Sequence, residues 1–114
     1  MRRRCRFTGQ AERDIRAVVR ASSQNFGRDA AARYNALLRQ SFDDIADDAS
    51  RPGVRPLGAR PGVFQYAIRF AKPRAGVKVG EPRHVVLFRL DPDGTVVVLR
   101  VLHERMLPER WIEE

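Results

Sequence analysis

The sequence predicts an α+β fold, with an N-terminal strand, an antiparallel helical hairpin, a three-stranded antiparallel meander and a short C-terminal tail. Three observations predict it. Apolar residues recur at helical spacing in two segments between residues 10 and 49, a loop rich in proline and glycine follows at 50–62, and three short apolar segments extend to residue 102. Because neither half could bury its apolar face alone, residues 1–114 are expected to form one domain.

The helical hairpin is predicted from residues 10–23 and 28–49, after a first strand at residues 2–7. Thr8 is a suitable N-cap for the first helix, and the segment 24–27, which ends in Gly27, suits a tight connection. The apolar stripe of the first helix is Ala11, Ile15, Val18 and Val19. The stripe of the second is Ala30, Tyr34, Leu37, Leu38, Phe42, Ile45 and Ala46. Two stripes joined by so short a loop predict antiparallel packing.

Four aspartates crowd the end of the second predicted helix. They are Asp43, Asp44, Asp47 and Asp48. Carboxylates at this end oppose the helix dipole, and paired carboxylates can also bind metal or transfer protons. Since no histidine lies nearby in the sequence, a solvated acidic face that pairs with the abundant arginines is the simpler interpretation.

The meander is predicted from strands at 63–70, 84–90 and 95–102, with a long basic connection at 71–82. The turn Asp91-Pro92-Asp93-Gly94 joins the last two strands. If Leu90 lies opposite Thr95, one face of the hairpin packs on the helices and the other carries two arginines. The helix-facing set is then Val86, Phe88, Leu90, Thr95, Val97, Leu99 and Val101. The outer set is Val85, Leu87, Arg89, Val96, Val98, Arg100 and Leu102. A bulge near Gly94 would exchange the faces.

The charge of the chain is strongly positive. Lysine and arginine together number 22, of which only Lys72 and Lys78 are lysines, and the net charge is +8. A genome rich in G and C would enrich arginine codons by itself. The functional interpretation is an anionic partner, because the guanidinium group binds carboxylate or phosphate through two parallel hydrogen bonds.

The sequence lacks the marks of export. It has no run of eighteen apolar residues and no apolar signal core after the basic N-terminus, so no membrane association is expected. The single cysteine, Cys5, is interpreted as a small buried side chain rather than a nucleophile. These features together predict a cytoplasmic protein.

No phosphate-binding, dinucleotide-binding or zinc motif is present, so neither a metal nor a cofactor is expected. The remaining candidate chemistry is a basic cluster in the C-terminal half: Arg69, Arg89, Arg100, His103, Arg105 and Arg110. His103 could serve RNA cleavage as an acid or base, or could simply bond to backbone at a strand end. Met106 and Trp111 could anchor a partner or fold onto their own core.

Four stretches together resemble a known family. They are Ala11–Ile15 (A-E-R-D-I), Phe26-Gly27 with Ala31 and Tyr34, Arg83–Leu90 (R-H-V-V-L-F-R-L), and Leu99–Met106 (L-R-V-L-H-E-R-M). In this order and spacing the chain resembles the ParE-like toxins of bacterial type II toxin–antitoxin modules, within the RelE/ParE superfamily. The resemblance covers nearly the whole chain. It implies a small sheet packed on a helical hairpin, and a ParD-like antitoxin whose disordered segment folds on the toxin.

The resemblance leaves the activity open between two kinds of toxin. ParE proteins target DNA gyrase, whereas RelE-type relatives cut messenger RNA on the ribosome. RelE-type nucleases usually carry a strand arginine where this chain has Val85, and commonly a terminal tyrosine, whereas no tyrosine follows Tyr66 here. A gyrase inhibitor without enzymatic activity is therefore the first hypothesis. Where ParE proteins often have an acidic residue after R-M, this chain has Leu107.

The candidate sites follow from this hypothesis. The predicted target-binding residues are Arg69, Arg89, Arg100, His103, Arg105, Arg110 and Trp111. The predicted antitoxin-binding residues are Ile15, Val19, Tyr34 and Leu38. If the chain is instead a ribonuclease, His103, Arg83 and Arg100 are the catalytic candidates. A third hypothesis is a non-toxic co-repressor that only binds its antitoxin. The antitoxin is expected to be acidic where it crosses the arginines, and the chain is not expected to bind nucleic acid by itself.

Overall fold

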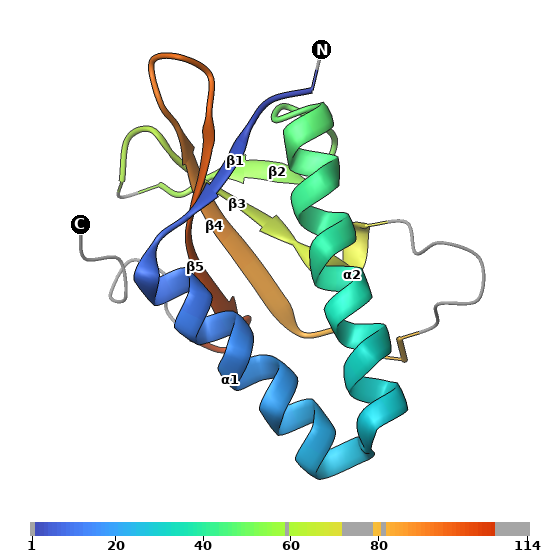
Figure 1. Ribbon diagram of the computed structural model, residues 1–114. Helices are drawn as coiled ribbons and strands as arrows, with labels where there is room; N and C mark the ends of the chain where they lie inside the picture. The colour runs from blue at the N-terminus through green and yellow to red at the C-terminus, as the bar shows by residue number, and fades with distance from the viewer. Residues whose placement is uncertain (1, 59, 72–78, 81, 107–114) are drawn as a thin grey trace.

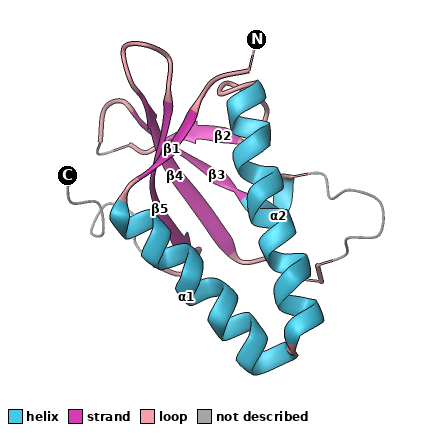
Figure 2. Ribbon diagram, viewed as in Figure 1, coloured by secondary structure: helices cyan, strands magenta, loops and turns pink. Residues whose placement is uncertain are grey.

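The predicted α+β architecture is confirmed by a computed structural model, which describes residues 2–58, 60–71, 79–80 and 82–106. Its elements are β1 (Cys5–Phe7), α1 (Gly9–Phe26), α2 (Arg28–Asp47), β2 (Val54–Pro56), β3 (Val63–Ala67), the 3₁₀ helix η1 (Ile68–Phe70), β4 (His84–Leu90) and β5 (Val96–His103). The strands form one mixed sheet in the order β1-β5-β4-β3-β2, in which only the β1–β5 pair is parallel. The two helices make a layer on one face of this sheet (Figure 1). Figure 2 separates the helical layer from the sheet by colour.

The helical hairpin forms as predicted, but its connection is shorter. The Thr8 side chain accepts a hydrogen bond from the Ala11 N–H at 3.1 Å and caps α1. Both helices extend up to Gly27, whose φ of 93° lies where residues with a Cβ are strained. Neither helix is long and apolar enough to cross a membrane, within the part of the chain that was described.

Three predictions about the strands need correction. The loop predicted at 50–62 contains β2, which pairs with β3 and adds a fifth strand to the sheet. Pro56 is tolerated there because β2 is an edge strand. The strand predicted at 63–70 ends at Ala67, and η1 follows it. This turn leaves the Phe70 side chain 44% exposed instead of placing it in the core. The first strand is also shorter than predicted, covering only Cys5–Phe7.

The acidic end of α2 is only partly a solvated face. Arg2 forms ion pairs with Asp43 and Asp47, as expected from the surplus of arginines. Asp44, however, is 7% exposed and accepts a hydrogen bond from Gln40 at 2.8 Å. Arg51 lies 3.5 Å from the same carboxylate. The prediction of solvent exposure is therefore wrong for Asp44, which helps to join the end of α2 to the chain that leads into β2.

The register of the β4–β5 hairpin differs from the predicted one in two places. Leu90 pairs with Val96 rather than Thr95, because the turn contains one residue more than predicted. The Asp91 carbonyl accepts a hydrogen bond from Gly94, and the Asp91 N–H donates to the Thr95 carbonyl. A bulge then inserts Leu99, since Phe88 pairs with Val98 and Leu87 with Arg100.

These two shifts exchange part of β5 between the faces. The helix-side core contains Val86 and Phe88 as predicted, together with Val96, Val98 and Val101. The opposite face carries Leu57, Val63, Ala67, Val85, Leu87, Val97, Leu99 and Leu102, with Met106 packed against them. The prediction is therefore correct for Val85 to Phe88 of β4 and for Val101 and Leu102 of β5, whereas Leu90 is 37% exposed and is not part of the helix-side core. It is wrong for Val96, Val97, Val98 and Leu99, because the longer turn reverses the faces until the bulge restores them.

The bulge is held by the start of α1. The Asp14 carboxylate accepts two hydrogen bonds from the Arg100 guanidinium, at 2.7 and 3.0 Å, and a third from the Val101 N–H at 3.0 Å. The Thr8 hydroxyl donates to the Leu99 carbonyl at 2.9 Å. β1 pairs with β5 only as far as Val98. Where β1 ends, side chains from the cap and the first turns of α1 thus bind the backbone of β5 at its edge. They also bind the Arg100 guanidinium.

Replacing Asp14 by alanine is expected to lower the free energy of unfolding by about 2–3 kcal/mol, since Arg100 would keep a largely covered charge without its carboxylate partner. Urea denaturation of the two proteins measures this. Adding Arg100→Leu to Asp14→Ala should recover part of the loss, because both partners are then uncharged. Arg16→Ala, on the exposed face of α1, is the control and should change stability by less than about 0.5 kcal/mol. No recovery in the double variant would contradict this account.

Candidate functional site

Two grooves meet where β4 begins and β5 ends. The helix-side groove, of about 780 Å³, is lined by Val18, Ala21, Ser22, Asn25, Phe26, Ala30, Arg33, Tyr34, Val79, Gly80, Arg83, His84 and His103. The sheet-side groove, of about 460 Å³, is lined by Gly53, Arg55, Leu57, Gln65, Ala67, Arg69, Phe70, Val85, Leu102, His103, Glu104 and Arg105. His103 belongs to both sets, so the end of β5 forms the wall between them.

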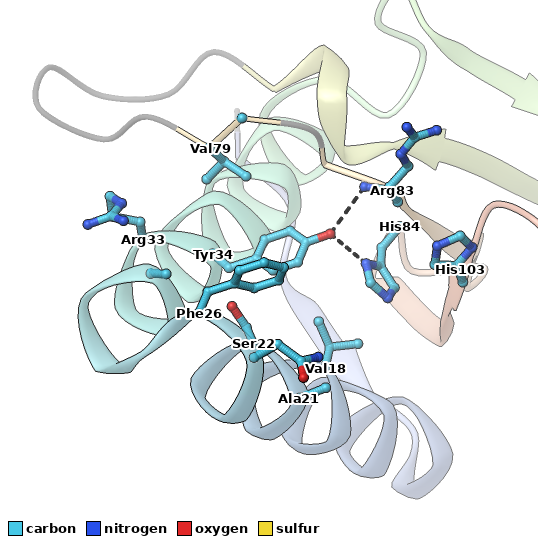
Figure 3. A pocket seen from close by; sticks show the side chains of 13 residues that line it. Val18, Ala21, Ser22, Phe26, Arg33, Tyr34, Val79, Arg83, His84 and His103 are labelled. Atoms are coloured by element: carbon cyan, nitrogen blue, oxygen red, sulfur yellow. Dashed lines mark hydrogen bonds between the residues drawn. The ribbon is translucent and has the colours of Figure 1, made fainter.

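The helix-side groove is organised by Tyr34 of α2, which points toward the start of β4 (Figure 3). Its hydroxyl accepts a hydrogen bond from the Arg83 backbone N–H at 3.2 Å and lies 2.5 Å from His84 Nδ1. Because the hydroxyl accepts from Arg83, its proton is available to the His84 nitrogen. Most of the remaining lining is apolar, and the Phe26 side chain is 77% exposed at the end of α1.

His84 is held as a neutral ring in this arrangement. Burial lowers its pKa to about 4, and the neighbouring His103 adds to the shift. The two rings pack edge to face with centroids 5.4 Å apart, on the terminal pair of β4 and β5. A neutral imidazole that accepts a hydrogen bond at Nδ1 carries its proton on Nε2. His84 therefore acts as a structural acceptor for Tyr34.

The sheet-side groove combines an apolar floor with a basic rim. Its floor includes Ala67, Val85 and Leu102 from the outer face of the sheet, all of them buried. Arg55 of β2, Arg69 of η1 and Arg105 after β5 bring positive charge to its lining. These arginines are distant in sequence. The order of strands β2, β3, β4 and β5 brings them to one place.

Glu104 bridges two arginines beside this groove. One carboxylate oxygen accepts from Arg69 at 3.0 Å, and the other accepts from Arg83 at 3.0 Å. The hydrogen bond from Arg83 is the main reason that the pKa of Glu104 lies below its ordinary value, and the charges of both arginines add to it. The Arg69 guanidinium also lies over the Phe70 ring, 5.0 Å from its centroid.

The structure brings three of the predicted target-binding residues together and separates two others. Arg69, His103 and Arg105 all line the sheet-side groove. Arg89 lies near the other end of β4, where it pairs with Asp91. Arg100 was predicted to bind the target, but its side chain is only 16% exposed and is bound to Asp14 of α1. Arg110 and Trp111 lie outside the described residues.

The predicted antitoxin-binding residues also divide. Ile15 and Val19 are half-buried against the helix-side core, and Tyr34 lines the helix-side groove. Leu38 is fully buried in the core, so its prediction as a contact residue is wrong. The stripe on α2 is wide enough to fill the core and still reach the groove, and helical spacing alone does not separate the two roles.

The three catalytic candidates for RNA cleavage are not brought together. His103 and Arg83 lie near each other, since the Glu104 N–H that follows His103 donates to the Arg83 carbonyl at 2.8 Å. Arg100 is instead held by Asp14 of α1. His103 Nδ1 accepts from the Arg105 backbone N–H at 3.2 Å, which agrees with the simpler prediction of a histidine bonded to backbone.

Several lining residues have no sequence signal of their own. Arg55 and Gln65 become neighbours in the groove only because β2 pairs with β3. In the sequence Glu104 is one of four glutamates in the last eleven residues, and His84 is only the first residue of a predicted strand. Phe26 follows the apolar stripe of α1, and its exposure could have been suspected from its position next to Gly27.

The described residues offer little for metal binding or for thiol chemistry. They contain no group of three or more histidine, cysteine, aspartate or glutamate side chains that could hold a metal ion. Cys5 is half-buried against the core, as expected. Burial, with a contribution from Asp43, raises the pKa of its thiol to about 11, so the reactive thiolate is scarce at neutral pH.

Comparison with known proteins identifies the family. The model of the ParE toxin of type II toxin–antitoxin systems, parDE, matches residues 5–108. The chain belongs to this family. The ParE-family toxin also resembles a solved structure of the chromosomal ParDE system of P. aeruginosa, with a TM-score of 0.68 and 16% identity over 89% of this chain and 95% of that one. At this identity the likeness shows the fold alone. No curated protein matches the chain.

A second solved structure widens the comparison. The toxin–antitoxin complex RelBE2 of Mycobacterium tuberculosis matches with a TM-score of 0.51 and 27% identity, over 90% of this chain and 99% of that one. Similarity to both a ParDE and a RelBE structure agrees with the resemblance to the RelE/ParE superfamily drawn from the sequence. Both structures are of toxin–antitoxin systems.

Lowering the pH is expected to destabilise the ParE-family toxin partly through His84. The unfolded chain binds a proton at this histidine near its ordinary pKa of 6.5, whereas the folded chain does so only near 4. The resulting loss of stability therefore begins as the pH falls below about 6.5 and continues toward 4. Urea denaturation at a series of pH values should give a shallower fall for His84→Gln than for the wild type. Parallel curves would contradict the assignment of a neutral, buried ring.

Proposed function

We propose that this ParE-family toxin inhibits DNA gyrase by binding it, without enzymatic activity, and that a cognate ParD-like antitoxin neutralises it. Gyrase follows from the resemblance to ParE proteins. The observation that carries the binding role is the sheet-side groove, whose floor is aliphatic and whose cations lie on its rim. A covered apolar floor with a polar rim is typical of protein-binding surfaces.

The geometry supports binding more strongly than RNA cleavage. Cleavage needs a base for the 2′-hydroxyl, an acid for the leaving group and a cation for the charge of the transition state. Arg100, the arginine in the middle of β5, is bound to Asp14 of α1. Val85 contributes a buried aliphatic side chain to the groove at the position where RelE-type nucleases usually carry an arginine. Tyr34 and Tyr66 both belong to the helix side of the sheet.

A ribosome-dependent ribonuclease is the second candidate function. His103 lines the sheet-side groove beside Arg105, and Arg83 is near, so an acid or base and a cation are available at one end. This candidate differs from gyrase inhibition in its substrate and in its dependence on His103. The two functions are therefore separable by experiment.

The purified toxin is expected to block supercoiling by gyrase, and Arg69→Ala with Arg105→Ala should weaken this inhibition at least about tenfold. Removing two rim cations lowers the attraction for an anionic patch on the target. The matched control is Arg13→Ala with Arg16→Ala, which removes the same charge from the exposed face of α1 and should inhibit like the wild type. The supercoiling assay gives the concentration for half inhibition of each protein.

Three outcomes distinguish the candidate functions. Normal supercoiling at saturating toxin rejects gyrase as the target. Cleavage of messenger RNA within codons on ribosomes, abolished by His103→Ala in a folded protein, supports the ribonuclease. Unimpaired growth on expression, with antitoxin binding retained, supports a non-toxic co-repressor.

The helix-side groove is the surface we assign to the antitoxin. It is lined mainly by small and apolar residues of α1 and α2, and Phe26 projects at its edge with 77% of its surface exposed. Arg33 and Arg83 lie among the lining residues and suit an acidic partner. An amphipathic segment that folds on binding would bury its apolar side here.

Phe26→Asp is expected to weaken binding of the antitoxin encoded by the neighbouring gene by at least about tenfold, because it places a carboxylate on an apolar contact. Isothermal titration calorimetry of purified toxin with antitoxin measures the change. Leu90→Asp is the control, since Leu90 is 37% exposed and lines neither groove. Equal affinities of the wild type and Phe26→Asp would remove the helix-side groove from the antitoxin interface.

A further inference from the structure

We propose that Arg69 and Arg83 form a carboxylate-binding site that Glu104 occupies in the free toxin, and that an acidic side chain of the target replaces Glu104 when a peptide segment enters the sheet-side groove. This proposal rests on the proposed function in one respect, because it takes the carboxylate to come from a protein target. The site and its internal occupant are defined by this chain alone.

The geometry of Glu104 is that of a bound ligand. Each of its two oxygens accepts one hydrogen bond, from Arg69 on one side and from Arg83 on the other, both at 3.0 Å. The two arginines come from different elements, since Arg69 belongs to η1 and Arg83 precedes β4. Arg69 is oriented further by the Phe70 ring beneath its guanidinium. The site therefore has two fixed walls that a different carboxylate could also join.

Exchange of the occupant is energetically easy. The side chains of Arg69 and Arg83 are 49% and 47% exposed, and that of Glu104 is 29% exposed. Ion pairs this exposed contribute little to stability, because water screens the charges and the side chains lose rotamer freedom. Glu104 follows the last residue of β5, so its side chain can turn away while its backbone N–H stays bonded to the Arg83 carbonyl.

The charge of the surroundings favours a second carboxylate. Among the described residues of the groove, Arg55, Arg69 and Arg105 are basic and Glu104 is the single acid. Arg83, just outside the groove, adds a further positive charge next to Glu104. The pKa of Glu104 is lowered chiefly by the hydrogen bond from Arg83, and the charges of Arg83 and Arg69 add to the shift; these two arginines stabilise any carboxylate placed between them.

The floor of the groove indicates a peptide rather than RNA. Leu57, Ala67, Val85 and Leu102 offer aliphatic surface to an apolar side chain next to the acidic one. Phe70 is the one aromatic residue in the described lining besides His103, and the Arg69 guanidinium already lies over its ring. Single-stranded nucleic acid is usually bound by free aromatic faces on which bases stack, and this groove lacks them in its described part.

The test uses the full-length toxin and a short acetylated peptide of alternating glutamate and leucine as the probe. Fluorescence anisotropy of the labelled peptide should show that Glu104→Gln binds it about fivefold more tightly than the wild type, because the internal competitor is lost. Arg69→Ala should bind it at least about fivefold more weakly. Glu12→Gln, which makes the same charge change on the exposed first turn of α1, is the matched control and should bind like the wild type.

Unchanged or weaker binding of the peptide by Glu104→Gln, with a melting temperature near that of the wild type, would overturn the proposal. Preference of Glu104→Gln for a labelled oligouridylate over the peptide would also overturn it, since the groove would then select phosphate. The supercoiling assay separates the two levels of inference. If Glu104→Gln binds the peptide more tightly but the toxin does not inhibit gyrase, the carboxylate site is supported and gyrase is rejected as the target. If Glu104→Gln changes neither gyrase inhibition nor peptide binding, only the carboxylate site is rejected.

Discussion

The Asp14 carboxylate holds β5 at the bulge that sets which of its side chains lie on each face of the sheet. It binds the Arg100 guanidinium with both oxygens and accepts the N–H of Val101, and so completes the edge of β5 beyond β1. Because β1 pairs with β5 only as far as Val98, the N–H of Val101 has no partner in β1. Here a side chain of α1 supplies that partner, and helix and sheet are joined by hydrogen bonds as well as by apolar packing.

The bulge also decides what the outer face can do. With Arg100 bound to Asp14 of α1, the outer face presents Val97, Leu99 and Leu102 from β5, and the cations of the sheet-side groove come from its borders. The same end of the hairpin carries His84 and His103 side by side. The two grooves therefore share a wall at His103. The helix-side groove suits an amphipathic partner, and the sheet-side groove suits an acidic segment. A partner on either side contacts the same strand end.

Much of this architecture was predictable from local patterns. Helical stripes, the Thr8 cap, Gly27 and the turn at Asp91–Gly94 each express a physical preference of a few neighbouring residues, and the family resemblance rests on their order. β2 was missed because three residues between prolines and glycines carry no strand signal, and form a strand only when β3 offers a partner. The first half of β5 was misassigned because one additional residue in a turn reverses the side chains that follow it, until the bulge at Leu99 restores the predicted faces.

The sequence by itself determined the α+β class, the helical hairpin, the surplus of arginine and the ParE family. These depend on composition, on periodicity and on residues close together in the chain. Only the tertiary structure decided which arginines act together. Arg55, Arg69 and Arg105 meet because four strands pair in one order, whereas Arg100 is withdrawn by an aspartate 86 positions away in the sequence. A cation is available to a partner only after its contacts within the fold are known, and those contacts are set by strand register and by the bulge.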